Sequence, residues 1–172
     1  IDYLPYYRKD SGGKVTIQNL LTHTSGIPNY TNNPEVMRNT VRNTYTVKDL
    51  VEKLCSGDLE FVPGTKYSYS NSGYVLLGAV IEEVTGKKYE KVLSENILIP
   101  LGMTNTGYDH ASEIIKNRAT GYDKTPFGYT NARYIDMSIP FSAGSLYSTV
   151  YDMYIWDQAL YTDKLLSNIN KE

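Results

Sequence analysis

Cysteine is almost absent from this chain of 172 residues, and its absence excludes several kinds of site. Cys55 is the single cysteine, so no disulfide can form within the chain and no cysteine-based metal cluster can be built. The two histidines, His23 and His110, lie far apart and outside any ligand-spaced motif. We therefore expect neither a metal site nor a cofactor.

Long runs of one charge and long apolar runs are also lacking. The formal net charge is -2 and no cluster of lysine or arginine occurs, which argues against binding to nucleic acid. No apolar run approaches the roughly 20 residues that span a bilayer. Phenylalanine and tryptophan are scarce, with 3 and 1 residues, against 17 tyrosines. Gathered tyrosines would indicate a carbohydrate- or peptide-binding face, but their even spread favours ordinary amphipathic packing.

The first residue is Ile1 and not methionine, and no signal peptide follows it. We expect the chain to be a piece of a longer protein. Its 41% hydrophobic and 21% charged residues are typical of a globular domain, and its length suffices for one.

Apolar residues spaced by three and four predict a mainly helical fold. Thr16 and Thr46 are candidate N-caps of two short helices. Pro34 fits the first turn of another, near residues 35–42. The remaining helices are expected at residues 75–84, ended by Gly86, at 89–97, broken by the run from Pro100 to Gly102, and from 148 or 149 onward with Asp152 near its start. The helix at 75–84 is apolar almost all round, so we expect it to be central and buried.

Two segments show little periodicity. Residues 1–13 are predicted to be a loop, and residues 104–142 an irregular segment with short strands near 119–122 and 129–132. No repeat or linker divides the chain, so we predict one mainly α domain over residues 1–172.

The loop that feeds the central helix carries the best candidates for chemistry. Tyr69 offers a phenol that can act as a base beside cations, and Asn71 offers both an amide donor and a carbonyl acceptor. A loop fixed by a rigid helix is a suitable place for catalytic groups. A structural alternative fits this loop equally well, in which Ser70 or Asn71 caps the helix and Tyr69 packs beneath it.

Residues 63–78, PGTKYSYSNSGYVLLG, resemble the second motif region of the class C β-lactamase and D-alanyl-D-alanine carboxypeptidase family, the penicillin-recognising serine hydrolases. Further blocks resemble the family in the same order: LLTHTSGIP at 20–28, VTG at 84–86, IPLGMTNT at 99–106 and SAGSLYSTVYDM at 142–153. Residues 109–139 resemble it only loosely.

The resemblance implies the helical domain of a β-lactamase/transpeptidase-like α/β fold in a two-domain serine hydrolase. In this family a serine on an S-x-x-K helix attacks an amide or ester carbonyl. Tyr69 would handle the proton, and Asn71 would contact the motif lysine or the substrate. Tyr30 and Phe141 fall where relatives line the substrate pocket, although loop packing explains both equally well. His23 would be structural, at a helix end.

This sequence departs from the family in two motifs. No K-T-G or H-x-G occurs, and the one S-x-x-K, Ser11 to Lys14, contains two glycines that disfavour a helix by about 1 kcal/mol each. We expect the nucleophile upstream and the third motif downstream of this chain, which alone should be inactive.

The parent protein is expected to act outside the cytoplasmic membrane on a β-lactam, a D-Ala-D-Ala peptide or an ester. A non-catalytic peptidoglycan- or peptide-binding module is the alternative, and no nucleic acid is expected as partner. The isolated chain would expose apolar surface normally covered by the S-x-x-K helix, which favours a non-native dimer.

Overall fold

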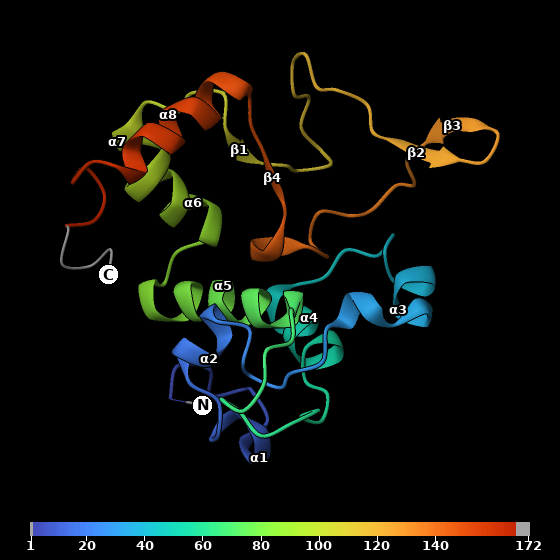
Figure 1. The fold of residues 1–172 in the computed structure, drawn as a ribbon, viewed down its shortest axis with the longest axis vertical. Coiled ribbons are helices and arrows are strands. Elements are labelled where there is room, and N and C mark those ends of the chain that lie inside the picture. Colours follow the sequence, from blue (N-terminus) through green and yellow to red (C-terminus); the bar gives the residue numbers. More distant parts are fainter. Residues whose placement is uncertain (1, 168–172) are drawn as a thin grey trace.

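The computed structural model describes residues 2–167, which are mainly helical, as predicted (Figure 1). Residues 1 and 168–172, which belong to the predicted domain 1–172, lie outside the described part. The helical elements are α1 (Lys9–Gly12), α2 (Ile17–Leu21), η1 (Tyr30–Asn32), α3 (Pro34–Asn39), α4 (Val47–Leu54), α5 (Asn71–Thr85), α6 (Tyr89–Leu93), η2 (Ser94–Leu98), α7 (Ile99–Leu101), η3 (Phe141–Ala143) and α8 (Val150–Leu160). The strands are β1 (Gly107–Tyr108), β2 (Tyr122–Thr125), β3 (Gly128–Asn131) and β4 (Leu146–Tyr147).

Helix α5 is the central element of the fold. In Figure 1 it lies across the middle of the molecule, and it packs against α2, α4 and α6 and closely against η3. Val75, Leu76 and Ala79 are buried in the main core, which confirms the predicted buried helix. Gly86 ends it in the left-handed conformation, with φ 66°. Burial does not extend to the last turn of the helix, where Val84 is exposed.

The helix starts follow the local capping signals. Thr16 accepts a hydrogen bond from the backbone N–H of Asn19 at 3.1 Å and thereby caps α2. Thr46 caps α4 in the same way through the N–H of Asp49, also at 3.1 Å. Both predicted N-caps are therefore confirmed. Helix α3 begins at Pro34 as predicted but ends three residues earlier than expected.

Two predictions about helices are wrong in part. The helix predicted at residues 89–97 continues past Pro100 through η2, which is a π-helix, and it ends at Gly102 with φ 73°, the last residue of the predicted break. Pro100 stands in the first turn of α7, where its missing N–H costs no helical hydrogen bond, and Asn96 Nδ2 donates to the carbonyl of Val92 at 2.8 Å.

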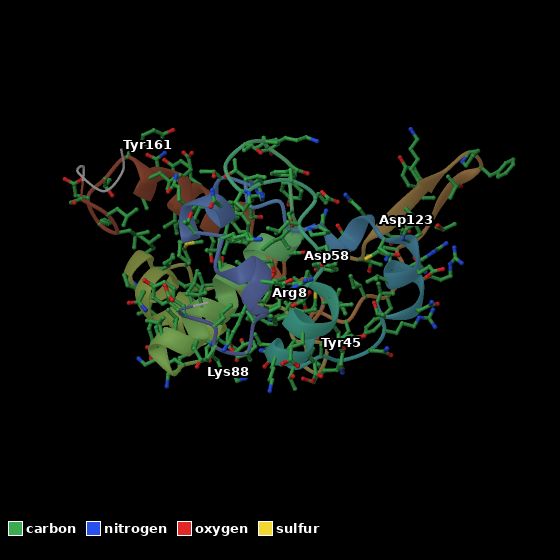
Figure 2. All side chains as sticks on the ribbon, turned by 90° about the horizontal axis from the view of Figure 1, so that it is seen from below. Arg8, Tyr45, Asp58, Lys88, Asp123 and Tyr161 are labelled. Carbon is green, nitrogen blue, oxygen red and sulfur yellow. The ribbon has the colours of Figure 1, made fainter. Side chains whose placement is uncertain are left out.

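The N-terminal loop also contains a helical turn, α1, which was not predicted. Arg8, immediately before it, forms an ion pair with Asp58 at 2.7 Å and donates to the carbonyl of Ser56 at 3.0 Å (Figure 2). These contacts attach α1 to the loop after α4. Such long-range contacts are invisible to local periodicity, which explains the missed turn.

Strands β2 and β3 form an antiparallel hairpin that projects from the helices, with Asp123 on it (Figure 2). The second strand lies close to its predicted position, whereas the first begins three residues later than predicted. Strands β1 and β4 pair antiparallel across the chain and were not predicted, because two residues are too few to show alternation.

The described residues form two hydrophobic clusters. The larger surrounds α5, and the smaller joins Leu98, Leu101 and Met103 to Ala159 of α8. Asp152 fixes α8 to the loop after α7, because its buried Oδ2 accepts hydrogen bonds from Asn105 N and Thr106 Oγ1, both at 2.8 Å. The candidate motif loops lie at the larger cluster.

Alkaline pH is expected to destabilise this core through Cys55. The side chain is fully buried at the end of α4, and burial raises the pKa of the Cys55 thiol from 9.0 to about 12. Because the folded state retains the thiol proton longer than the unfolded state, stability is complete below pH 9 and falls as pH rises towards 12. Urea unfolding should show that the chain loses about 1 kcal/mol more than Cys55→Ala between pH 8 and pH 10. Parallel losses in both proteins would contradict this.

Candidate functional site

Two loops distant in sequence meet beneath the start of α5. The backbone N–H groups of Glu60, Gly64 and Ser68 donate to the carbonyls of Gly26, Thr24 and His23 respectively, each at 2.8 Å. Gly26 is required there, because its φ is 74° and an added Cβ would lie 2.4 Å from the carbonyl oxygen of Phe61. The block at residues 20–28 thus holds the loop that carries Tyr69.

His23 occupies a structural position in this joint. Its Nδ1 accepts a hydrogen bond from the backbone N–H of Ser70 at 3.2 Å, so it contacts the residue before α5 and does not cap its own helix. Its ring centroid lies 4.5 Å from that of Tyr69 and 5.0 Å from that of Tyr74. His23 therefore supports the Tyr69 ring from one side, in line with the structural role implied by the resemblance.

Tyr69 and Asn71 lie together, at the surface and at the first turn of α5. The phenol O–H of Tyr69 donates to Asn71 Oδ1 at 3.0 Å, and the Tyr69 side chain is 54% exposed. Asn71 is half-buried, and its backbone N–H donates to Asn29 Oδ1 at 3.2 Å. An exposed phenol on a supported ring, held by a fixed amide, has the access to solvent and the rigidity that proton transfer requires.

The cation that would assist Tyr69 is not supplied by the preceding lysine. Lys66 places its Nζ 5.7 Å from the ring centroid of Phe61, and no contact with Tyr69 accompanies it among the described residues. A phenol acting as a base is helped by a neighbouring positive charge, which favours its ionised form. Among the described contacts, Lys66 does not bring such a charge to Tyr69.

Tyr30 and Phe141 lie in the hydrophobic core. Tyr30 is 4% exposed, its O–H donates to the carbonyl of Ile139 at 2.7 Å, and burial raises its pKa. Phe141 is 6% exposed and packs edge-on against Tyr89, with ring centroids 5.5 Å apart. These positions fit the loop-packing alternative, and a role of either residue in lining a substrate pocket stays a prediction.

The S-x-x-K sequence at the N-terminus does not have the geometry of a nucleophile motif. Ser11 is 4% exposed, and α1 ends at Gly12, so Lys14 lies outside the helix and is exposed. A serine and a lysine spaced by three residues meet only on one helical face. The structure thus supports the rejection of this match.

Sequence reasoning missed two residues of the site, Asn29 and Thr31. Thr31 Oγ1 accepts a hydrogen bond from Asn71 Nδ2 at 3.1 Å, and Asn29 contacts the backbone of Asn71. The only sequence signal was an asparagine- and threonine-rich loop, which does not indicate a partner 40 residues away. Over residues 2–167, no group of three or more His, Cys, Asp or Glu side chains is arranged to hold a metal ion.

Comparison with known proteins places the chain in a family. The sequence model of the Beta-lactamase family matches residues 1–171, so the chain belongs to this family. The putative penicillin-binding protein PbpX of Bacillus subtilis (strain 168) is 36% identical over 171 residues, which are 99% of this chain and 41% of that protein. Penicillin-binding protein 4* of the same organism is 33% identical over 173 residues, covering 92% of this chain and 38% of that protein.

Solved structures show the same relationship. The D-stereospecific amidohydrolase from Streptomyces sp. matches with a TM-score of 0.83 and 30% identity over 98% of this chain and 54% of that one. The D-amino acid amidase from Ochrobactrum anthropi SV3, complexed with L-phenylalanine amide, matches with a TM-score of 0.81 and 28% identity. The match covers 95% of this chain and 47% of that one. The chain thus spans about half, or less, of the length of its relatives. The predicted family, and a fold of the β-lactamase/transpeptidase type, are confirmed.

Proposed function

We propose that this chain is the helical part of a two-domain serine hydrolase that transfers acyl groups from amides, as D,D-peptidases and β-lactamases do. The observation that carries the proposal is the exposed Tyr69 phenol, held by Asn71 at the start of a buried helix. In the complete protein Tyr69 accepts and returns the proton of the attacking serine. Asn71 contacts the motif lysine or the carbonyl oxygen of the substrate.

The remaining catalytic groups are proposed to come from the segments that relatives have beyond this length. A serine on an S-x-x-K helix would supply the nucleophile, and its lysine the cation that the Tyr69 loop does not supply. Backbone N–H groups near that serine would stabilise the oxyanion, and a third motif would complete the pocket. A groove of about 430 Å³ between the N-terminal segment, α2 and α5, whose mixed lining includes Leu20, Leu76 and Val80, supports a missing packing partner.

The substrate is proposed to be a small molecule or peptide with an amide bond beside a D-configured centre. The relatives support this class, since their names include penicillin-binding proteins and D-amino acid amidases. Hydrolysis of an ester is the alternative, because a serine nucleophile can take an acyl group from an amide or from an ester. A non-catalytic binding module would differ in lacking an upstream S-x-x-K or a downstream K-T-G or H-x-G.

We propose that the complete protein acts outside the cytoplasmic membrane. The support is the similarity to proteins named as penicillin-binding proteins. Among the described helices none is both long and apolar enough to cross a bilayer. A non-native dimer of the isolated chain stays a prediction. Its basis is the apolar part of that groove, which includes Leu20, Leu76 and Val80.

A fluorescent penicillin tests the proposal directly. We expect covalent labelling of the full-length gene product on a denaturing gel and no labelling of the 172-residue chain alone, because the nucleophile lies elsewhere. Ser11→Ala in the isolated chain is the matched control, since Ser11 begins its one S-x-x-K sequence. Labelling of the isolated chain that disappears in Ser11→Ala would overturn the assignment. An unlabelled full-length protein would favour an esterase or a non-catalytic relative.

A further inference from the structure

Exposed aromatic side chains gather on the β2–β3 hairpin, which projects from the helices (Figure 1, Figure 2). Tyr122 and Tyr129 are exposed, and the side chain of Phe127 is fully exposed. The strand register pairs Tyr122 with Asn131 and Lys124 with Tyr129. Paired residues of an antiparallel ladder share a face, and so do residues two apart in one strand. The two tyrosines therefore stand on one face of the hairpin, behind the phenylalanine at its tip.

The turn that carries Phe127 is held by its neighbours. Thr125 Oγ1 accepts a hydrogen bond from the backbone N–H of Phe127 at 3.2 Å and donates one to the carbonyl of Gly128 at 3.1 Å. Pro126 restricts the backbone immediately before Phe127. Gly128 takes a φ of 125°, which other residues rarely adopt. The ring is thus presented to solvent by a preordered turn, so a contact at this ring orders little further backbone.

Polarity increases along the hairpin from its tip towards the helices. The apolar Phe127 comes first, and the Lys124–Tyr129 pair and then the Tyr122–Asn131 pair follow it. These two pairs lie two residues apart, which is about 7 Å along the strands. The interface of a bilayer changes in the same order, since acyl chains give way to a headgroup layer that favours tyrosine rings and lysine side chains.

The two faces of the hairpin differ in charge. Lys124 shares the face of the tyrosines. Arg133 does so too, because the backbone N–H of Ala132 donates to the Gly121 carbonyl at 2.9 Å and continues the ladder past β3. Neither cation forms an ion pair within residues 2–167. Asp123, the one acid of residues 121–133, lies on the opposite face, so the tyrosine face is complementary to an anionic surface.

We propose that the β2–β3 hairpin docks on the surface of a bilayer that contains anionic phospholipid. Phe127 enters the boundary between headgroups and acyl chains. Tyr122 and Tyr129 lie among the headgroups, and Lys124 and Arg133 contact the headgroup phosphates. The contact is peripheral and reversible, because one ring and two cations supply a modest affinity. It is independent of the proposed acyl transfer.

A carbohydrate fits this hairpin less well than a lipid surface. Exposed tyrosines can stack on sugar rings, and Asn131 could donate and accept hydrogen bonds beside them. A sugar chain offers no apolar phase, however, for the fully exposed Phe127 at the tip. A bilayer interface accommodates both the apolar tip and the cationic face behind it.

A fluorescent probe at the tip tests the proposal in the full-length gene product. The Phe127→Trp protein is mixed with vesicles of equal parts phosphatidylglycerol and phosphatidylcholine, and the unmodified protein corrects for the emission of Trp156. We expect the emission to move to shorter wavelength and to be quenched by brominated acyl chains. Vesicles of phosphatidylcholine alone should give a weaker response that salt does not change, because the cations then have no anionic partner.

Co-sedimentation with the same vesicles measures the contribution of each side chain. Phe127→Ser should weaken binding about 10-fold. Its matched control is Tyr161→Ser, which removes another exposed aromatic ring, far from Asp123 in Figure 2, and should leave binding unchanged. Lys124→Gln should weaken binding about fivefold, whereas Lys88→Gln, also exposed but distant from the hairpin, should not.

The outcomes separate this proposal from the proposed function. Emission of the Phe127→Trp protein that is already shifted without vesicles would show that the hairpin packs on the rest of the protein, and would overturn the proposal. Absence of quenching with either kind of vesicle, or equal binding of Phe127→Ser, would overturn it as well. Retention on insoluble polysaccharide without binding to vesicles would overturn the lipid in favour of a carbohydrate. Vesicle binding by a protein that penicillin does not acylate would count against the proposed function alone, and Phe127→Ser should leave acylation unchanged.

Discussion

Replacing Tyr69 by phenylalanine in the full-length gene product is expected to slow acylation by fluorescent penicillin by at least about 100-fold. The change removes the phenol oxygen and leaves the ring, so the packing against His23 at 4.5 Å should survive. Proton transfer by a positioned side chain typically contributes about 100- to 10,000-fold. The rate of labelling, measured by stopping samples at intervals on a denaturing gel, gives the size of the loss.

Tyr67→Phe is the matched control for this loss. Tyr67 lies on the same loop, is 66% exposed, and contacts His23 only edge-on at 6.0 Å between centroids. Its substitution should leave the labelling rate within about twofold, because surface changes away from special features rarely cost more than 0.5 kcal/mol. Equal rates in Tyr69→Phe and the unmodified protein would restrict Tyr69 to a structural role while leaving the family assignment intact.

A single added methyl group at Gly78 is expected to destabilise the fold by about 2 kcal/mol. A Cβ at this position would lie 2.1 Å from Ser142 Oγ, 2.4 Å from Ser142 Cβ and 2.8 Å from a ring carbon of Phe141. Because Ser142 Cβ is attached directly to the backbone, η3 must move away from α5. The movement would also strain the hydrogen bond from Ser142 Oγ to the Tyr74 carbonyl at 2.8 Å. The free energy of unfolding of Gly78→Ala in urea measures the effect.

Gly73→Ala provides the comparison within the same helix. Its nearest contact would be the Leu20 carbonyl oxygen at 3.6 Å, an ordinary van der Waals distance. Alanine favours the helical backbone over glycine by about 1 kcal/mol, so this variant should be neutral or slightly stabilised. Equal stabilities of the two variants would show that η3 does not pack tightly on α5 and would contradict the described contact.

The agreement between sequence and structure is greatest where structure is local. Thr16 and Thr46 each cap a helix by accepting a hydrogen bond from the N–H three residues ahead, and Gly86 ends α5, because these signals act within one turn. Of the predicted break from Pro100 to Gly102, only Gly102 ends the helix, since Pro100 stands in the first turn of α7, where its missing N–H costs no helical bond. The first strand of the hairpin was misplaced by three residues, because an exposed strand has no buried face to show its period.

The candidate site likewise has residues that local sequence predicts and residues that only the structure reveals. Tyr69 and Asn71 stand out in the sequence because they lie two residues apart, beside the start of a predicted helix. Their supporting residues, His23, Asn29 and Thr31, come from segments about 40 or more positions earlier. The contacts of these three residues with the Tyr69 loop therefore cannot be predicted from local sequence and depend on how the two loops pack.

By itself the sequence determined the helical class, the positions of the caps and the membership in a family, since all three depend on residue order and spacing. The tertiary structure decided which groups meet: that Tyr30 and Phe141 pack into the core, that His23 contacts the start of α5, and that Thr31 bonds to Asn71. The physical reason is that hydrogen bonds and close packing act over about 3–4 Å between atoms, whatever the distance along the chain.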